Sequence, residues 1–176
     1  AKYERLFMAG LREMMPDKAF YPDANSTMRL TYSSVQDYKG ADAVYYDYKT
    51  HLSGVMDKED PTNEEFIVPA KLKELYAKKD FGRYGCGDDL VVGFLTTNDI
   101  TGGNSGSPVI NGNGELIGLA FDGNWEAMSG NIAYEPNLQR TICVDIRYVL
   151  FVIDKYAGAQ NLIDELTIAP IKFTVQ

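Results

Sequence analysis

A tight turn between two apolar, β-prone runs is the feature that most constrains how this chain folds. An Asn-Gly pair at 111–112 separates the short run 109–110 from the longer run 116–121. An Asn-Gly pair in this setting is a strong hairpin signal, because both residues tolerate the positive φ that a tight turn needs. Other short runs with strand-like composition occur at 28–32, 43–49, 90–97, 132–134 and 141–146. The sequence therefore predicts a mainly β protein made of short strands.

Three segments carry helical patterns instead. Apolar residues recur near helical spacing over 2–15, and Pro16 stops that run. Pro69 suits the first turn of a short helix, and residues 147–156 form a second apolar face that ends before Gly158. Six or so strands with tight turns, closed by a C-terminal helix, favour an antiparallel barrel with flanking helices over a β-α-β fold.

Composition limits the class of protein and of partner. The 176 residues suit one domain, and 45% hydrophobic against 24% charged residues is the balance of a globular chain rather than a disordered one. A net charge of −8 without a basic stripe argues against a nucleic-acid partner. No apolar run reaches the roughly 18 residues that span a bilayer, so no membrane span is expected.

The two cysteines, Cys86 and Cys143, stand too far apart in sequence for a short metal-binding motif, and no metal or other cofactor is predicted. They permit one disulfide without requiring it. Two buried free thiols are the favoured alternative, since unpaired cysteine often packs as a small hydrophobic residue.

A Gly-rich stretch at 101–109 carries the candidate chemistry. Ser105 is flanked by residues that let the backbone fold tightly around an exposed hydroxyl. The N–H groups of Gly103 and Ser105 could then converge on one point, as is needed to hold the oxyanion of an acyl-transfer intermediate. A plain Gly-Ser turn is the alternative. The Pro108 that follows, with the hairpin after it, favours the catalytic interpretation.

These residues resemble a known family. The run Gly-Asn-Ser-Gly-Ser-Pro at 103–108 is similar to the Gly-Asp-Ser-Gly-Gly-Pro nucleophile motif of trypsin-like serine peptidases. Together with 116–126 and 38–46, it resembles bacterial dipeptidyl-peptidase 7-like serine peptidases, which pair a trypsin-like double barrel with an inserted helical domain. The resemblance implies that Ser105 is the nucleophile and that Gly103 supplies an oxyanion-hole N–H.

The resemblance also implies an organisation. Residues 1–20 would end the helical domain, and 21–176 would form the C-terminal, six-stranded trypsin-like barrel that bears the nucleophile. The expected partners are peptide substrates, a missing N-terminal barrel that supplies the triad His and Asp, and a second copy in a homodimer. A periplasmic or cell-surface location is implied as well.

Two departures from the family pattern matter. Asn104 replaces the acidic residue that pairs with a freed amino terminus in most trypsin-like enzymes, so activation by cleavage is not expected. The one histidine, His51, lies in Lys-Thr-His-Leu, which does not match the sequence around a trypsin-like catalytic His. We expect a polar loop residue there, and a chain that is inactive alone because a serine hydroxyl without a base is a weak nucleophile.

The segment after the hairpin predicts how substrate is selected. By the resemblance, Asp122 binds the free amino group of the incoming peptide, and Gly123 lies in the P1 pocket where acidic-specific relatives carry Arg. A glycine leaves that pocket open and uncharged, which favours hydrophobic P1 residues. Trp125 either lines the pocket or packs in the barrel.

Two other functions stay open on these residues alone. A trypsin-like barrel without catalysis could serve as a binding or dimerisation module. Loss of catalysis would predict changes around the nucleophile, yet Gly103, Ser105 and Pro108 are all in place. A complete small cysteine or serine peptidase would need a base of its own, for which the chain offers only His51.

Overall fold

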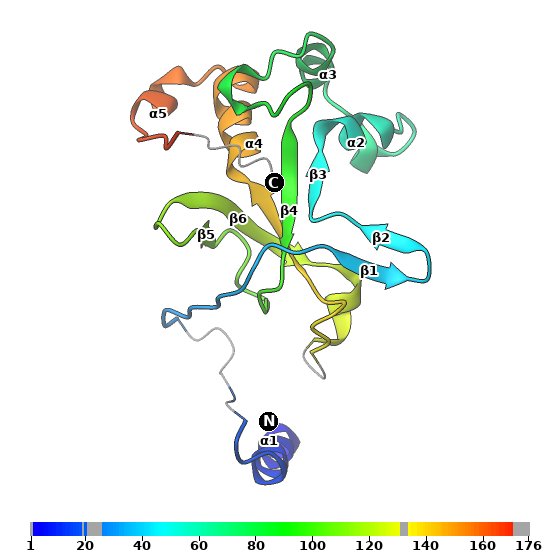
Figure 1. Ribbon diagram of the computed structural model, residues 1–176, viewed down its shortest axis with the longest axis vertical. Coiled ribbons are helices and arrows are strands. Elements are labelled where there is room, and N and C mark those ends of the chain that lie inside the picture. The colour runs from blue at the N-terminus through cyan, green and yellow to red at the C-terminus, as the bar shows by residue number, and fades with distance from the viewer. Residues whose placement is uncertain (1, 19, 21–25, 131–133, 171–176) are drawn as a thin grey trace.

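The computed structural model describes residues 2–18, 20, 26–130 and 134–170. In these residues, two groups of three consecutive strands and a seventh strand are separated by short helices (Figure 1). The strands are β1 (Tyr38–Ala41), β2 (Val44–Tyr46), β3 (Lys49–His51), β4 (Val91–Thr96), β5 (Pro108–Ile110), β6 (Leu116–Gly123) and β7 (Thr141–Asp145). The α-helices are α1 (Lys2–Met14), α2 (Leu52–Asp57), α3 (Ala70–Ala77), α4 (Ile146–Phe151) and α5 (Gln160–Asp164). Single turns of other helix types are η1 (Glu64–Phe66), η2 (Gly82–Tyr84), η3 (Trp125–Ser129) and η4 (Val152–Tyr156).

Five strands form one antiparallel sheet in the order β3-β4-β7-β6-β5, and β1 pairs with β2 in a separate hairpin. The hairpin β5–β6 therefore occupies one edge of the main sheet, and β3 occupies the other. This is the mainly β, antiparallel class with flanking helices that the sequence predicts. The strand count differs in one respect, because the main sheet has five strands rather than six.

A glycine lets two central strands pack closely. A Cβ on Gly118 of β6 would lie 2.6 Å from the carbonyl oxygen of Val144 and 2.8 Å from the ring of Phe94. Both distances are shorter than real contacts, so any side chain at 118 would push β6 away from β7 or displace the Phe94 ring.

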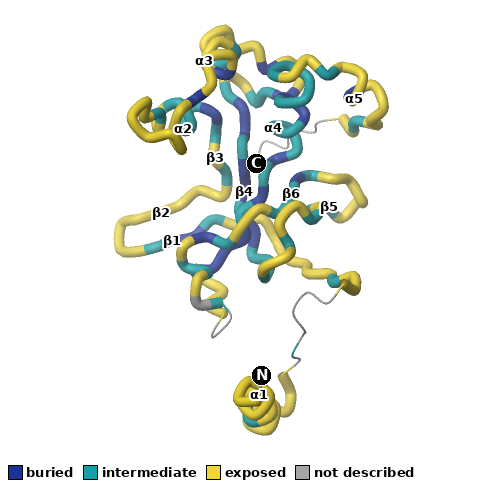
Figure 2. Tube along the Cα trace, turned by 180° about the vertical axis from the view of Figure 1, so that it is seen from behind, coloured by how far each residue is buried: buried dark blue, intermediate teal, exposed yellow. Residues whose placement is uncertain are grey.

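The apolar core lies at one end of the sheet, beneath the helices. Leu90, at the start of β4, and Leu52, at the start of α2, are fully buried there, and Phe151 of α4 joins them. Around these three, the buried cluster comprises Val68, Leu72, Phe81, Tyr84, Leu150 and Ile163. Figure 2 shows the buried trace running from the helical end down the central strands.

Helix α1 differs from the other α-helices because none of its residues is buried. It lies apart from the sheet in Figure 1, with large apolar side chains such as Leu6, Phe7 and Met14 exposed. No helix in the described residues is long and apolar enough to cross a membrane.

The hairpin is confirmed as β5–β6, the helix over 2–15 as α1 and the strand over 141–146 as β7. In the turn 111–114 the residue with positive φ is Gly114, at 81°, rather than Asn111 or Gly112. The helix over 147–156 is also confirmed, as α4 continued by the π-helical turn η4. Gly158, just after it, has a positive φ of 70°, as expected of a residue that ends a helix.

One predicted strand is wrong, because 28–32 forms no strand. That segment has polar and apolar residues in alternation, yet Met28, Leu30 and Tyr32 are all exposed, so no buried face holds it in a sheet. The predicted strand over 132–134 lies outside the described residues except for Tyr134, which is not in a strand.

Candidate active site

The hydroxyl of Ser105 is exposed in the loop between β4 and β5, and its Oγ donates a hydrogen bond to the carbonyl oxygen of Phe121 at 3.1 Å. That carbonyl is available because β6 bulges against β7: the register pairs Ala120 with Cys143 and then Asp122 with Ile142. Phe121 is the extra residue of the bulge. Bulges of this kind re-aim side chains beside active sites.

Backbone hydrogen bonds hold the loop against β6. The N–H of Gly106 donates to the carbonyl of Ala120 at 2.7 Å, and the N–H of Ala120 donates to the carbonyl of Ser107 at 2.9 Å. Gly103 has a φ of 97°, a left-handed conformation that a residue with a side chain adopts only with strain. Within the described ranges, the N–H groups of Gly103 and Ser105 donate to no protein acceptor. Two free, neighbouring amides in such a loop are what an oxyanion hole requires.

Asn104, the residue before Ser105, has partners that the sequence did not suggest. The side-chain oxygen Oδ1 of Asn104 accepts from the N–H of Thr101 at 2.9 Å and from Nη2 of Arg29 at 3.3 Å. The same Nη2 of Arg29 donates to Oγ1 of Thr101 at 3.0 Å. Arg29 is half-buried and lies 75 residues before Asn104 in the chain. The start of the loop that carries Ser105 is therefore held by the guanidinium of a residue far away in the sequence.

Asp122 lies on β6 and is exposed, as the sequence interpretation requires. Its Oδ1 accepts from the N–H of Gly123 at 2.7 Å, which fixes the carboxylate close to the backbone. Because of the bulge, Phe121 and Asp122 are both exposed even though they are consecutive in a strand. A carboxylate fixed on an exposed strand end beside Ser105 can bind a cation at a defined distance from the hydroxyl.

Gly123 faces a small hollow. A Cβ at this position would lie 2.9 Å from the Cβ of Ala127 and 3.8 Å from Cγ2 of Ile100. Ala127 and Ile100 both line the hollow, which is completed by Asn98, Asp99, Gly130, Tyr134, Gln139 and Arg140. A side chain at 123 would thus fill this space. Burial raises the pKa of Asp99, while a hydrogen bond from the N–H of Ile100 opposes that shift.

A buried arginine supports the far side of the hollow. The guanidinium of Arg140 donates to the carbonyls of Asp37 at 2.8 Å, Pro136 at 2.8 Å and Gln139 at 2.8 Å. Its backbone N–H donates to Oδ1 of Asn124 at 2.8 Å, and Asn124 directly follows β6. These bonds join the segment 135–140 to the end of the strand that carries Asp122.

Two expectations about single residues are decided by the structure. Of the two alternatives for Trp125, packing in the barrel is excluded, because the residue opens the turn η3 and is 84% exposed. The expectation for His51 is wrong. His51 is not a loop residue, because it ends β3 and pairs with Val91. Since β3 and β5 are the opposite edges of the sheet, the structure does not bring His51 to Ser105.

The two cysteines are free thiols. Cys143 is buried in β7, and burial raises its pKa to about 11, so the thiol stays protonated at neutral pH. Cys86 is half-buried. The alternative of free thiols is therefore confirmed, with only Cys143 fully enclosed.

Sequence reasoning missed Arg29, Asp99 and Arg140. Asp99 lies close before the Ser105 motif, and that proximity was the only available signal for it. Nothing in the local pattern around Arg29 or Arg140 marks either as a contact of the loop or of the hollow, since both act on residues brought close by the fold.

Comparison with known proteins gives consistent matches over this whole region. A family model described as peptidase S46 matches residues 1–168. Dipeptidyl-peptidase 7 of Phocaeicola vulgatus is 64% identical over 165 residues, which are 93% of this chain and 23% of that protein. An Asp/Glu-specific dipeptidyl-peptidase of Porphyromonas gingivalis is 55% identical over 168 residues, covering 95% of this chain and 23% of the relative.

Solved structures agree with these matches. The crystal structure of Porphyromonas endodontalis DPP11 in complex with the dipeptide Arg-Glu superposes with a TM-score of 0.83 at 51% identity, covering 90% of this chain and 23% of that one. The antiparallel sheet with its flanking helices is consistent with part of a trypsin-like barrel. This chain spans about a quarter of the length of the relatives it matches.

Proposed function

The chain belongs to the peptidase S46 family, and on that premise we propose that it is the nucleophile-bearing part of a serine-type dipeptidyl peptidase. The observation that carries the proposal is the exposed hydroxyl of Ser105 beside two backbone N–H groups, those of Gly103 and Ser105 itself, which donate to no acceptor in the described ranges. The relatives' names, all dipeptidyl peptidases, support the same reaction class.

The proposed chemistry is acyl transfer. Oγ of Ser105 gives its proton to a base and attacks the carbonyl carbon of the second residue, while the N–H groups of Gly103 and Ser105 donate to the oxygen that becomes negative. The bond to the nitrogen of the third residue then breaks, that nitrogen takes the proton and leaves as the amine of the shortened peptide, and water hydrolyses the dipeptidyl ester on Oγ. In the structure the hydroxyl donates to Phe121, so it must exchange that carbonyl for a base before it can attack. His51, at the opposite edge of the sheet, is not that base in this proposal.

The base and its orienting carboxylate are proposed to come from the part of the relatives that this chain does not span. The exposed apolar face of α1 fits the same proposal, because Leu6, Phe7 and Met14 need a neighbouring domain to cover them. By this argument α1 ends a helical domain, and the chain alone hydrolyses no peptides.

The test is the full-length enzyme with Ser105→Ala, compared with Ser107→Ala in the same loop as the matched control. We expect the first to lose essentially all dipeptide release and the second to keep it. In the isolated chain, phosphonofluoridate-type serine reagents should leave Ser105 unlabelled, because no base activates it. Dipeptide release by Ser105→Ala would overturn the proposed nucleophile, and stoichiometric labelling of the isolated chain would overturn the need for an external base.

Asp122 is proposed to bind the free amino group of the substrate. A charge-assisted hydrogen bond of this kind is worth ~1.5–3 kcal/mol, or about 10- to 150-fold in kcat/KM. Asp122→Asn should therefore weaken cleavage of free-amine peptides by about that factor and leave the slower cleavage of N-acetylated peptides nearly unchanged. Equal losses on both substrates would mean that Asp122 supports the strand instead.

The hollow beside Gly123 is proposed as the P1 pocket, with hydrophobic side chains preferred. Ile100 and Ala127 are its apolar lining residues, and the glycine beside them brings neither bulk nor charge. Gly123→Arg should shift the preference toward acidic P1 residues. The new side chain would meet Ala127, so Gly123→Arg with Ala127→Gly is the matched variant that makes room for it. An unchanged ratio of Leu- to Asp-type cleavage in both variants would contradict this pocket.

A further inference from the structure

We propose that Arg29 is a positioning residue for the oxyanion hole, acting through the side chain of Asn104. The inference rests on the proposed function of Ser105. Its basis is a contact between two segments far apart in sequence, the segment before β1 and the nucleophile loop.

The two halves of the nucleophile loop are held differently. After Ser105, backbone bonds to β6 fix residues 106 and 107 through the strand ladder. Before Ser105, the loop turns back through a backbone bond from the N–H of Asn104 to the carbonyl of Thr101 at 3.1 Å, and within the described ranges no strand bonds support it. The side chains of Thr101 and Asn104 take that role, and Arg29 donates to both.

This arrangement places Arg29 on the residue between the two amides. The peptide unit that joins Asn104 to Ser105 carries the Ser105 N–H, so the backbone conformation of Asn104 sets the direction of that N–H and its position relative to the N–H of Gly103. Oδ1 of Asn104 already accepts from the N–H of Thr101, and the guanidinium adds a charged donor to the same oxygen. Charged donors form stronger hydrogen bonds than neutral ones, so Arg29 holds Asn104 in one rotamer.

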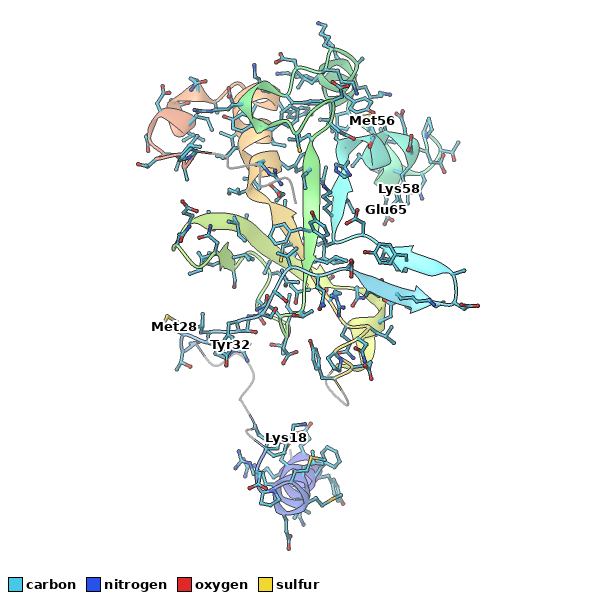
Figure 3. The ribbon with its side chains drawn as sticks, viewed as in Figure 1. Lys18, Met28, Tyr32, Met56, Lys58 and Glu65 are labelled. Carbon is cyan, nitrogen blue, oxygen red and sulfur yellow. The ribbon has the colours of Figure 1, made fainter. Side chains whose placement is uncertain are left out.

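The segment that carries Arg29 is itself anchored to the main sheet. The N–H of Gln36 donates to the carbonyl of Leu95 at 3.2 Å, the N–H of Thr97 donates to the carbonyl of Ser34 at 3.0 Å, and Nδ2 of Asn98 donates to Oγ1 of Thr31 at 3.3 Å. Its large apolar side chains point outward. Met28 and Tyr32, on either side of Arg29, are 97% and 89% exposed, and Figure 3 shows them at the lower left of the sheet, away from Met56 and Lys58 at the upper right.

This pattern separates Arg29 from its neighbours. A segment kept for packing would bury Met28 or Tyr32, yet the half-buried residue is the arginine, whose guanidinium reaches the loop. Asn104 cannot form the ion pair that an acidic residue would form at this position. Instead, the neutral Oδ1 of Asn104 accepts from both Thr101 and Arg29, and these bonds hold the loop without an ion pair.

The test uses the full-length enzyme with Arg29→Gln, Arg29→Lys and, as a matched control, Arg12→Gln on the exposed face of α1. We expect Arg29→Gln to lower kcat by about tenfold or more with KM little changed, because a displaced oxyanion donor weakens binding of the transition state alone. Arg29→Lys should recover part of this rate, and Arg12→Gln should match the parent enzyme.

Two further readouts separate positioning from a general loss of structure. Inhibition by a peptidyl boronic acid, which forms a tetrahedral adduct, should weaken in parallel with kcat, whereas inhibition by the product dipeptide should not. In the background of Asn104→Leu, adding Arg29→Gln should cost much less than it does alone, because both act through one side chain. Circular dichroism and the melting temperature identify any variant that fails to fold. If Arg29→Gln fails to fold, the test is made instead with Arg29→Ala, to which guanidinium is added in place of the missing side chain.

The outcomes are distinct. Parent-like kcat in Arg29→Gln, a loss confined to KM, or full additivity with Asn104→Leu would overturn the positioning role. If Ser105→Ala keeps its activity, the proposed nucleophile fails instead, whatever Arg29 does.

Discussion

The end of the sheet covered by α2 to α5 is packed with apolar side chains, whereas the end that carries Ser105 is held by hydrogen bonds. At the helical end, Leu52, Leu90 and Phe151 are completely buried. At the other end the buried residues include the polar side chains of Asn124, Gln139 and Arg140 beside the ring of Tyr38, and the guanidinium of Arg140 joins the segment 135–140 to Asp37. The bonds of Asn124 to Arg140 extend this support to the end of β6.

The difference follows from what each end must do. An apolar core needs only volume and enclosure, so side chains can close it on every side. A substrate site must leave hydroxyl, amide and carboxylate groups open to the outside, and so it cannot be closed with apolar side chains. Directional bonds can hold loops in place there without covering them. The comparison therefore predicts that stability is lost at the helical end when the volume of a core side chain is removed, and at the site end when a hydrogen-bond donor is removed.

Removal of a large core side chain should give the largest change in stability. Phe151→Ala deletes a fully buried ring that contacts Phe81 at 6.2 Å between centroids. We expect the free energy of unfolding to fall by about 3–5 kcal/mol, because both the transfer energy and the cavity contribute. Urea denaturation of the chain followed by circular dichroism measures this. Phe66→Ala is the control, because its side chain is 44% exposed and should cost far less.

Removal of the arginine at the site end should come next. Arg140→Gln leaves the carbonyls of Asp37 and Pro136 without their charged donor, and we expect a loss of about 2–4 kcal/mol. Arg83→Gln, at an exposed arginine of η2, should change stability by less than about 0.5 kcal/mol. A similar small change at both positions would show that the polar end is held by something other than this network.

Cys143, in the middle of β7 between the two ends, gives a pH-dependent test. Burial raises the pKa of its thiol from 9.0 to about 11. Well below pH 9 both folded and unfolded thiols are protonated and the group has no effect. Between about pH 9 and 11 the unfolded thiol ionises more readily than the folded one, so stability falls as pH rises through this window.

Across this window the thiol should lower the free energy of unfolding by about 1.5–2 kcal/mol. Cys143→Ala should remove this contribution, and the difference between parent and variant isolates it from the tyrosines that titrate in the same range. An identical fall with pH in both proteins would show that the thiol is not enclosed.

The smallest effect should come from a polar group within the apolar end. Tyr84 is 1% exposed and its hydroxyl donates to Oδ2 of Asp154 at 2.8 Å. Tyr84→Phe keeps the ring and removes only that bond, so we expect a loss of about 1 kcal/mol. A loss as large as that of Arg140→Gln would erase the distinction between the two ends.

Patterns local in sequence predicted most of the regular structure. The Asn-Gly turn set the β5–β6 hairpin, and helical spacing set α1 and α4, because these signals depend on neighbours within a few residues. The Ser105 motif is likewise local, and so its residues suffice to recognise it. The alternation of polar and apolar residues in 28–32 gave a wrong strand for the same reason. It is a property of the segment alone, whereas a strand also needs a neighbouring surface that buries its apolar face.

The hairpin, the helices α1 and α4, and a glycine-lined serine with Asp122 and Gly123 after it can all be inferred from the order of the residues. How these parts are held depends on the folded chain. The bulge at Phe121, the exposure of Trp125 and the contacts of Arg29 and Arg140 all involve strands and loops from distant parts of the sequence. Hydrogen bonds and burial are properties of pairs of groups in space, so residues far apart in sequence acquire these roles only when the sheet assembles.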